Sequence, residues 1–92
     1  MASLDALATL VARLRSPDGC PWDRAQTPET LRRHLLEEAF EVVEAIDDGD
    51  DSALEKELGD LLFLVVLLAR MVEERGASTL QDIADGVHAK MI

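Results

Sequence analysis

Two pairs of acidic residues have a spacing that would let them bind a cation. Glu38 and Glu41 lie three residues apart in the segment LLEEAFEVVEAI, and Glu57 and Asp60 have the same spacing in LEKELGDLLFLVVLLA. Side chains three residues apart on a helix are neighbours, so each pair would repel by about 0.2–0.5 kcal/mol. An unpaired buried carboxylate is costlier still, and a bound cation is the simplest compensation. The pattern therefore predicts a metal site built from these four carboxylates.

Helical periodicity predicts where these acids lie on their helices. With about 100° between successive residues, Glu57 falls in the middle of an apolar stripe that includes Leu64. In the preceding helix we expect Glu38 at the edge of the apolar face and Glu41 about 60° further round. Glu37 points outward, where a solvated helix former is the alternative to a functional role. A short connection favours antiparallel packing, so the two acid pairs should meet across the groove between the helices.

Four helices are expected to position these acids. They run from Ser3 to about Ser16, from Pro28 to Asp47, from Ser52 to about Arg75, and from Ser78 towards Ile92. The apolar face of the second is expected to comprise Leu31, Leu35, Ala39, Val42, Val43 and Ile46. The inward residues of the fourth are expected to be Leu80, Ile83, Ala84 and Val87. Because no strand signal is found, the expected fold class is all-α, with a four-helix bundle-like arrangement.

Capping residues and turn formers indicate where the helices begin and end. Thr27 precedes Pro28, which fits the first position of a helix. Capping boxes are expected at two further helix starts, Ser52 with Glu55 and Ser78 with Gln81. Gly76 fits a C-terminal stop. Between the first two helices, SPDGCPWDRAQT is rich in turn-forming residues and predicts an ordered loop anchored by Trp22.

Composition limits the classes of function. The 92 residues are 48% hydrophobic and 30% charged, which fits one globular domain over residues 1–92. The formal charge of -10 argues against nucleic-acid binding and favours cations or metal-complexed anions as ligands. The single cysteine, Cys20, excludes an intrachain disulfide and fits a reducing compartment. Since the apolar run from Leu61 to Ala69 is too short to span a bilayer, we expect a cytoplasmic protein with no membrane partner.

Oligomerisation is expected from the helix that carries Glu57 and Asp60. Its residues from Leu61 to Val72 are apolar around almost the whole circumference, which implies burial on more than one side. A chain of this size has few other residues with which to cover the second side. A homodimer or a higher homo-oligomer is therefore expected.

The acid motif, Glu37-Glu38-x-x-Glu41 followed by Glu57-x-x-Asp60, resembles the paired signature of the MazG-like all-α nucleoside triphosphate pyrophosphohydrolases. The stretches CPWDRAQTPETLRRHLLEEAFEVVEAID and KELGDLLFLVVLLAR are also similar to MazG domains. The likeness extends from about residue 10 to residue 92, and the acid motif joined to CPWD makes it specific. MazG domains usually continue past the segment that resembles HAKMI into a basic stretch, which this chain lacks.

The resemblance implies hydrolysis of a nucleoside triphosphate between its α and β phosphates, which gives the monophosphate and pyrophosphate. It implies Mg²⁺ as the metal, with Mn²⁺ as the alternative ion, bound by Glu38, Glu41, Glu57 and Asp60. Glu37 would join Glu38 and Glu41 as a catalytic residue if it reaches the attacking water as a general base. The alternative is a catalytically weak or silent helical module for dimerisation or regulation. A di-iron bundle would need Glu-x-x-His motifs, which neither acid pair offers.

A triphosphate also needs positive groups around it. By the resemblance, Lys90 matches a lysine near the end of the family domain and is the first candidate for phosphate contact. Arg24 and Arg33 are further candidates, for which ion pairs with nearby acids are the alternative. Trp22 could stack on the nucleobase, with a packing role as the alternative.

Overall fold

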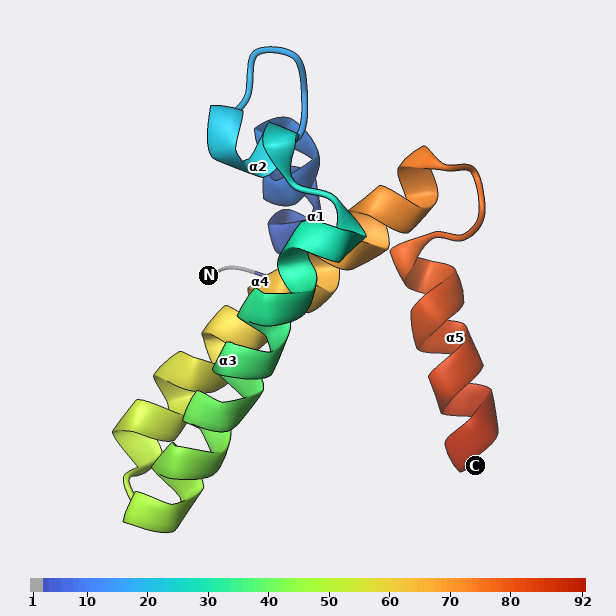
Figure 1. Cartoon of the computed structure of the whole chain (residues 1–92). Helices are drawn as coiled ribbons and strands as arrows, with labels where there is room; N and C mark the ends of the chain where they lie inside the picture. Colours follow the sequence, from blue (N-terminus) through green and yellow to red (C-terminus); the bar gives the residue numbers. More distant parts are fainter. Residues whose placement is uncertain (1–2) are drawn as a thin grey trace. The chain divides into compact units, whose positions relative to one another are not determined.

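The computed structural model describes residues 3–92, and this part of the chain folds into α-helices without any strand. The helices are α1 (Leu4–Leu14), α2 (Pro21–Ala25), α3 (Pro28–Asp48), α4 (Asp51–Glu74) and α5 (Leu80–Met91), as seen in Figure 1. The expectation of an all-α fold is therefore confirmed. None of the helices in the described residues is both long and apolar enough to cross a membrane.

The described residues form two compact units. The terminal unit comprises residues 3–25 and 66–92, and the hairpin unit comprises residues 26–65. The hairpin unit consists of α3 and the first part of α4, which lie side by side and antiparallel in Figure 1. All four acids of the sequence motif belong to the hairpin unit, so its packing decides whether they meet.

Side-chain caps fix the ends of α3. The Thr27 hydroxyl accepts from the Thr30 backbone N–H at 3.2 Å, and the Thr30 hydroxyl accepts from the Thr27 N–H at 2.9 Å. These reciprocal bonds satisfy donors that a helix start leaves free, and they confirm Thr27 as the N-cap. At the other end Gly49 has a φ of 65°, a left-handed conformation that glycine adopts without steric penalty. The helix therefore stops abruptly, two residues before α4 begins.

Both expected capping boxes are wrong, because the capping residue lies one or two positions away from the expected one. The Asp50 carboxylate, rather than Ser52, accepts from a backbone N–H in the first turn of α4, that of Ala53 at 3.0 Å. At the start of α5 the box is formed by Thr79 and Asp82. The sequence offers several short polar side chains in a row at both places, and only the backbone conformation selects one of them.

The α3–α4 hairpin is packed along a seam with alternating spacings of three and four residues. The inward positions of α3, buried or half-buried, are Leu31, Leu35, Glu38, Val42 and Ala45. Those of α4 are Leu54, Glu57, Leu61 and Leu64. This spacing is typical of two helices that pack along their length. Glu38 therefore lies within the seam, and its expected place at the edge of the apolar face is wrong.

Part of the expected apolar face of α3 is exposed. Val43, Ile46 and Ala39 face solvent in the described chain, together with Leu36, which is 73% exposed, and Phe40, which is 63% exposed. The helix thus carries two apolar stripes, of which only one is covered within the hairpin unit. The expectation that a single broad face would be buried is wrong for this reason.

The terminal unit has its own buried side chains and a network around Arg15. Its core contains Val11, Val66, Leu67, Ala69 and Met71. Arg15 donates to the Asp23 carbonyl at 2.8 Å and, through Nε, to the Glu74 carboxylate at 3.1 Å. These bonds link the end of α1 and helix α2 to the end of α4. The hydrogen bonds and charge of Arg15, together with the charge of Arg70, lower the pKa of Glu74 despite its partial burial.

Three expectations for the terminal unit are wrong. Residues 21–25 form the short helix α2 instead of a loop, because Pro21 fits a first helical position. The buried side chain there is Asp23, which is 5% exposed, whereas Trp22 is 47% exposed and is not the anchor. In α5, Ile83 and Val87 are exposed rather than inward. The confirmed end signal is Gly76, whose φ of 72° follows the last turn of α4.

Candidate metal centre

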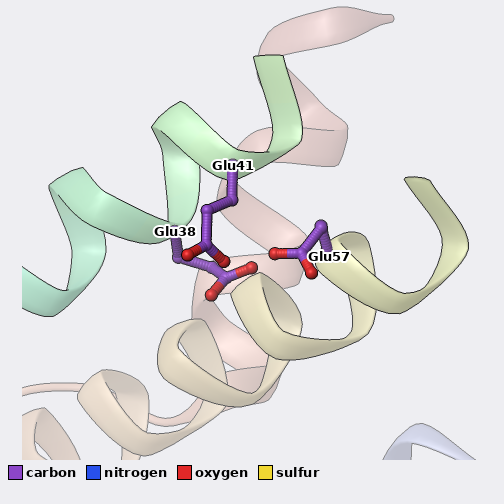
Figure 2. Close-up of side chains that lie close together, drawn as sticks. All are labelled: Glu38, Glu41 and Glu57. Carbon is purple, nitrogen blue, oxygen red and sulfur yellow. The ribbon is translucent and has the colours of Figure 1, made fainter. Parts of the chain in front are cut away.

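Three carboxylates converge in the hairpin unit. Glu38 and Glu41 project from adjacent turns of α3, and Glu57 projects from the facing part of α4. One oxygen of each carboxylate lies within 4.8 Å of the others. Figure 2 shows the three side chains pointing toward one another between the two helices. We refer to Glu38, Glu41 and Glu57 as the carboxylate cluster.

Two oxygens of the cluster are buried and accept no hydrogen bond. They are Oε1 of Glu38 and Oε2 of Glu57, and the side chain of Glu57 is only 12% exposed. Buried acceptors without a donor carry the full penalty of lost hydration. Hard oxygen ligands of this kind are those that Mg²⁺ and Mn²⁺ prefer. The chemistry of the donor set therefore fits a divalent cation.

Because the three carboxylates lie close together, the pKa values of two of them are raised and that of the third is lowered. Burial, followed by the contact with Glu57 and the charges of Glu57, Glu41 and Asp60, together raise the pKa of Glu38 to about 7. The contact with Glu57 also raises the pKa of Glu41. The pKa of Glu57 is lowered, because the other two carboxyls can donate hydrogen bonds to it. Near neutral pH the cluster thus retains part of a proton, which a bound cation has to displace.

Asp60, the fourth acid of the sequence motif, is exposed and lies outside the cluster. It is close enough for its charge to raise the pKa of Glu38 and Glu41. The expected meeting of four carboxylates is therefore found for three of them. Asp60 follows Glu57 by three residues, or about 300° of helix rotation, which turns it away from the seam.

A charged residue at the cluster that the spacing of the acids did not reveal is Lys56. Its ammonium lies 3.5 Å from Oε1 of Glu57, and its side chain is 76% exposed. The charge of Glu57 raises the pKa of Lys56, and Asp60 and Glu41 act in the same direction. The sequence feature that could have indicated this contact is the position of Lys56 directly before Glu57 in the acid-rich segment EKELGD.

An open hollow of about 380 Å³ lies beside the cluster within the hairpin unit. It is lined by Glu41, Glu44, Ala45, Asp48, Ala53, Lys56 and Glu57. Four of these residues carry a carboxylate, and Lys56 is the one cation among them. A ligand in this hollow would have to bring positive charge with it, as a metal-complexed anion does.

The other expected site residues are not members of the carboxylate cluster. Glu37 and Arg33 lie on the outer surface of α3 and form an exposed ion pair with 3.7 Å between Oε1 and Nε. Trp22 and Arg24 belong to α2, and Lys90 belongs to α5, all within the terminal unit. Lys90 and Arg24 are exposed. The roles of these five residues in catalysis or substrate binding stay predictions.

Sequence comparisons show that the chain is similar to MazG proteins over the segment that carries the cluster. The MazG nucleotide pyrophosphohydrolase domain matches residues 26–92, which include the whole cluster. A nucleoside triphosphate pyrophosphohydrolase/pyrophosphatase MazG of Thermotoga maritima is 44% identical over 88 residues, covering 96% of this chain and 34% of that protein. A nucleoside triphosphate pyrophosphohydrolase of Escherichia coli K12 is 45% identical, covering 99% of this chain and 35% of that protein. An uncharacterized Bacillus subtilis protein, YabN, is 40% identical over 84 residues, which are 17% of its length. This chain spans about a third of the first two relatives, and it belongs to the MazG nucleotide pyrophosphohydrolase domain family.

Proposed function

We propose that this chain hydrolyses nucleoside triphosphates to nucleoside monophosphates and pyrophosphate in a reaction that depends on Mg²⁺. The observation that supports it best is the carboxylate cluster, with its two buried oxygens that lack a hydrogen-bond donor. The names of the Thermotoga and Escherichia relatives, which are similar to the chain over nearly its whole length, support the substrate class. Nucleotide substrates and the single cysteine also favour a cytoplasmic protein.

The proposed metal ligands are Glu38, Glu41 and Glu57, with Asp60 as the fourth. When bound, the ion would neutralise charge on the phosphates and make water a better nucleophile, and Mn²⁺ would serve as the alternative. The helices hold the acids in place, because Glu38 and Glu57 are fixed in the packed seam. Glu41 is the exposed member of the cluster, so a substrate or water can reach it from solvent.

Other residues of the chain would bind and orient the nucleotide. Lys90, Arg24 and Arg33 stay our candidates for phosphate contact, and Trp22, with its half-exposed ring, for stacking on the base. For Glu37 to act as general base, its ion pair with Arg33 has to open. No Ser or Cys is invoked as a nucleophile, since water attacks the phosphorus in this proposal.

The reaction is tested with the purified chain and a panel of ribo- and deoxyribonucleoside triphosphates, with Mg²⁺ or with EDTA. We expect anion-exchange chromatography to show monophosphate and pyrophosphate with Mg²⁺ and no product with EDTA. Diphosphate with inorganic phosphate would contradict the proposed bond cleavage. A chain that binds Mg²⁺ but hydrolyses none of the triphosphates would instead support the silent dimerisation module.

We also propose that the chain is a homodimer that associates through the second apolar stripe of α3. Leu36, Phe40 and Val43 are exposed there, and α4 exposes a matching stripe, Leu58, Leu62 and Val65. Helical periodicity places both stripes on the side of the hairpin away from Glu41, so association there leaves the cluster open. Exposed apolar patches that extend over two helices are typical of protein interfaces.

The dimer is tested by replacing Phe40 with glutamate. A buried charge in an apolar interface is costly, so we expect Phe40→Glu to convert a dimer into a monomer in light scattering coupled to size exclusion. Val87→Glu, which adds the same charge to an exposed apolar position of α5, is the matched control and should leave the dimer intact. A wild-type chain that is monomeric at every concentration would contradict the proposal.

A further inference from the structure

Lys56 is the one cation among the residues that line the acidic hollow, and it touches the cluster. Its Nζ lies 3.5 Å from Oε1 of Glu57, while the other charged lining residues are acids. The two side chains differ sharply in exposure, at 76% for Lys56 and 12% for Glu57. The carboxylate is thus held in the packed seam, whereas the ammonium is on a flexible chain in solvent.

Lys56 can exchange its contact with Glu57 for a contact with another anion. An ion pair with one exposed partner is weak, so a better partner readily displaces it. Without a metal, the ammonium offsets part of the repulsion among the three carboxylates. Once a divalent cation occupies the cluster, the ammonium and the ion repel each other, because both face the same carboxylate of Glu57. Phosphate oxygens brought in with the ion would then offer the ammonium a new anionic partner.

We propose that Lys56 exchanges partners, pairing with Glu57 before the metal binds and with a phosphate oxygen of the metal-complexed nucleotide afterwards. The inference rests on the proposed function and adds a phosphate-contacting residue to it. Lys56 thereby weakens the binding of a metal ion alone and strengthens the binding of a metal ion together with phosphate. The hollow provides no other cation for a phosphate chain, so this discrimination depends on one side chain.

The test compares the wild-type chain with Lys56→Gln and Lys56→Arg by isothermal titration calorimetry. For Mn²⁺ alone, Lys56→Gln should lower the Kd by about two- to fivefold, the size expected for loss of a partly exposed competing charge. For inorganic pyrophosphate at saturating Mg²⁺, the same variant should raise the Kd by about tenfold or more, because a charge-assisted hydrogen bond is lost. Lys56→Arg keeps the charge and should stay within about twofold of wild type in both titrations.

Arg75→Gln is the matched control, since it removes one positive charge from an exposed residue that directly follows α4 and belongs to the terminal unit. It should leave both Kd values unchanged, and circular dichroism should show the same helix content in all variants. Equal Mn²⁺ affinity of wild type and Lys56→Gln, or unchanged pyrophosphate affinity, would overturn the partner exchange while the metal site stands. Absence of Mn²⁺ binding in the wild-type chain would overturn the metal site and the exchange together.

Discussion

Glu57→Gln is expected to abolish binding of divalent cations and to lower kcat by about 100-fold or more, while the helical fold is kept. The side chain of Glu57 is only 12% exposed, and its Oε2 accepts no hydrogen bond. Its lowered pKa keeps it ionised at neutral pH, so it is available as a ligand to a cation. Glutamine has the same shape but no charge, so the packed seam is preserved and the ligand is lost.

The thermal stability of Glu57→Gln should no longer respond to divalent cations. In EDTA, the amide of Gln at position 57 can donate to Glu38 or Glu41, and one of three converging negative charges is gone. Because the ligand is lost, we expect no rise in the Tm of Glu57→Gln on addition of Mg²⁺, measured by differential scanning fluorimetry. Glu55→Gln is the control, because Glu55 is an exposed acid on the same helix. Full Mg²⁺ binding by Glu57→Gln would contradict the assignment of the cluster as the metal site.

The second large effect is expected in the pH dependence of stability without metal, and it comes from Glu38. Its pKa is about 7 in the folded chain, against 4.5 ordinarily, because of burial and the neighbouring carboxylates. An acid with a raised pKa binds more protons in the folded than in the unfolded state. Its contribution to the free energy of unfolding therefore falls as pH rises from about 4.5 to about 7. Glu57 and Glu74 have lowered pKa values and contribute the opposite slope, with stability lost as pH falls below the ordinary range.

Glu38→Gln isolates this contribution. In EDTA the variant should match wild type near pH 4.5 and exceed it at pH 7.5, by roughly 1–2 kcal/mol after allowance for solvent access to the site. For a chain of this size that corresponds to about 4–15 °C in Tm. With saturating Mg²⁺ the order should reverse, because the wild-type ligand is then stabilised in its charged form. A wild-type Tm in EDTA that exceeds that of Glu38→Gln at pH 7.5 would contradict the raised pKa.

The carboxylate cluster was largely predictable, because the 3.6-residue period and the type of each residue are local properties of the sequence. Helical spacing and antiparallel packing predicted that Glu38, Glu41 and Glu57 would meet, and the structure places them together. Asp60 illustrates the limit of that reasoning, since an i, i+3 partner deviates from the seam by about 60° and can be exposed. Lys56 comes directly before Glu57, a spacing that does not make helical neighbours, so its ion pair with Glu57 depends on which way a flexible side chain turns.

The fold was predicted less well where one helix carries two apolar stripes and only one of them is buried. α3 carries one stripe through Leu31, Leu35 and Val42 and another through Leu36 and Phe40, and both are apolar enough to be buried. Which stripe α4 covers depends on tertiary packing that the sequence of α3 does not contain. The same holds for the caps at Asp50 and Thr79, where neighbouring polar residues had similar propensities and the backbone conformation made the choice.

The connection between the two helices has a consequence for how such a site can vary. Glu41 stands eight residues before Gly49, and Glu57 stands seven residues after Asp50, so both lie about two turns from the connection. A single residue inserted into either arm would turn the acid beyond it by about 100° and shift it by about 1.5 Å. Substitutions at exposed positions of the arms leave this relation unchanged. The number of residues in each arm, more than their identity, determines whether the two helices present their carboxylates to each other.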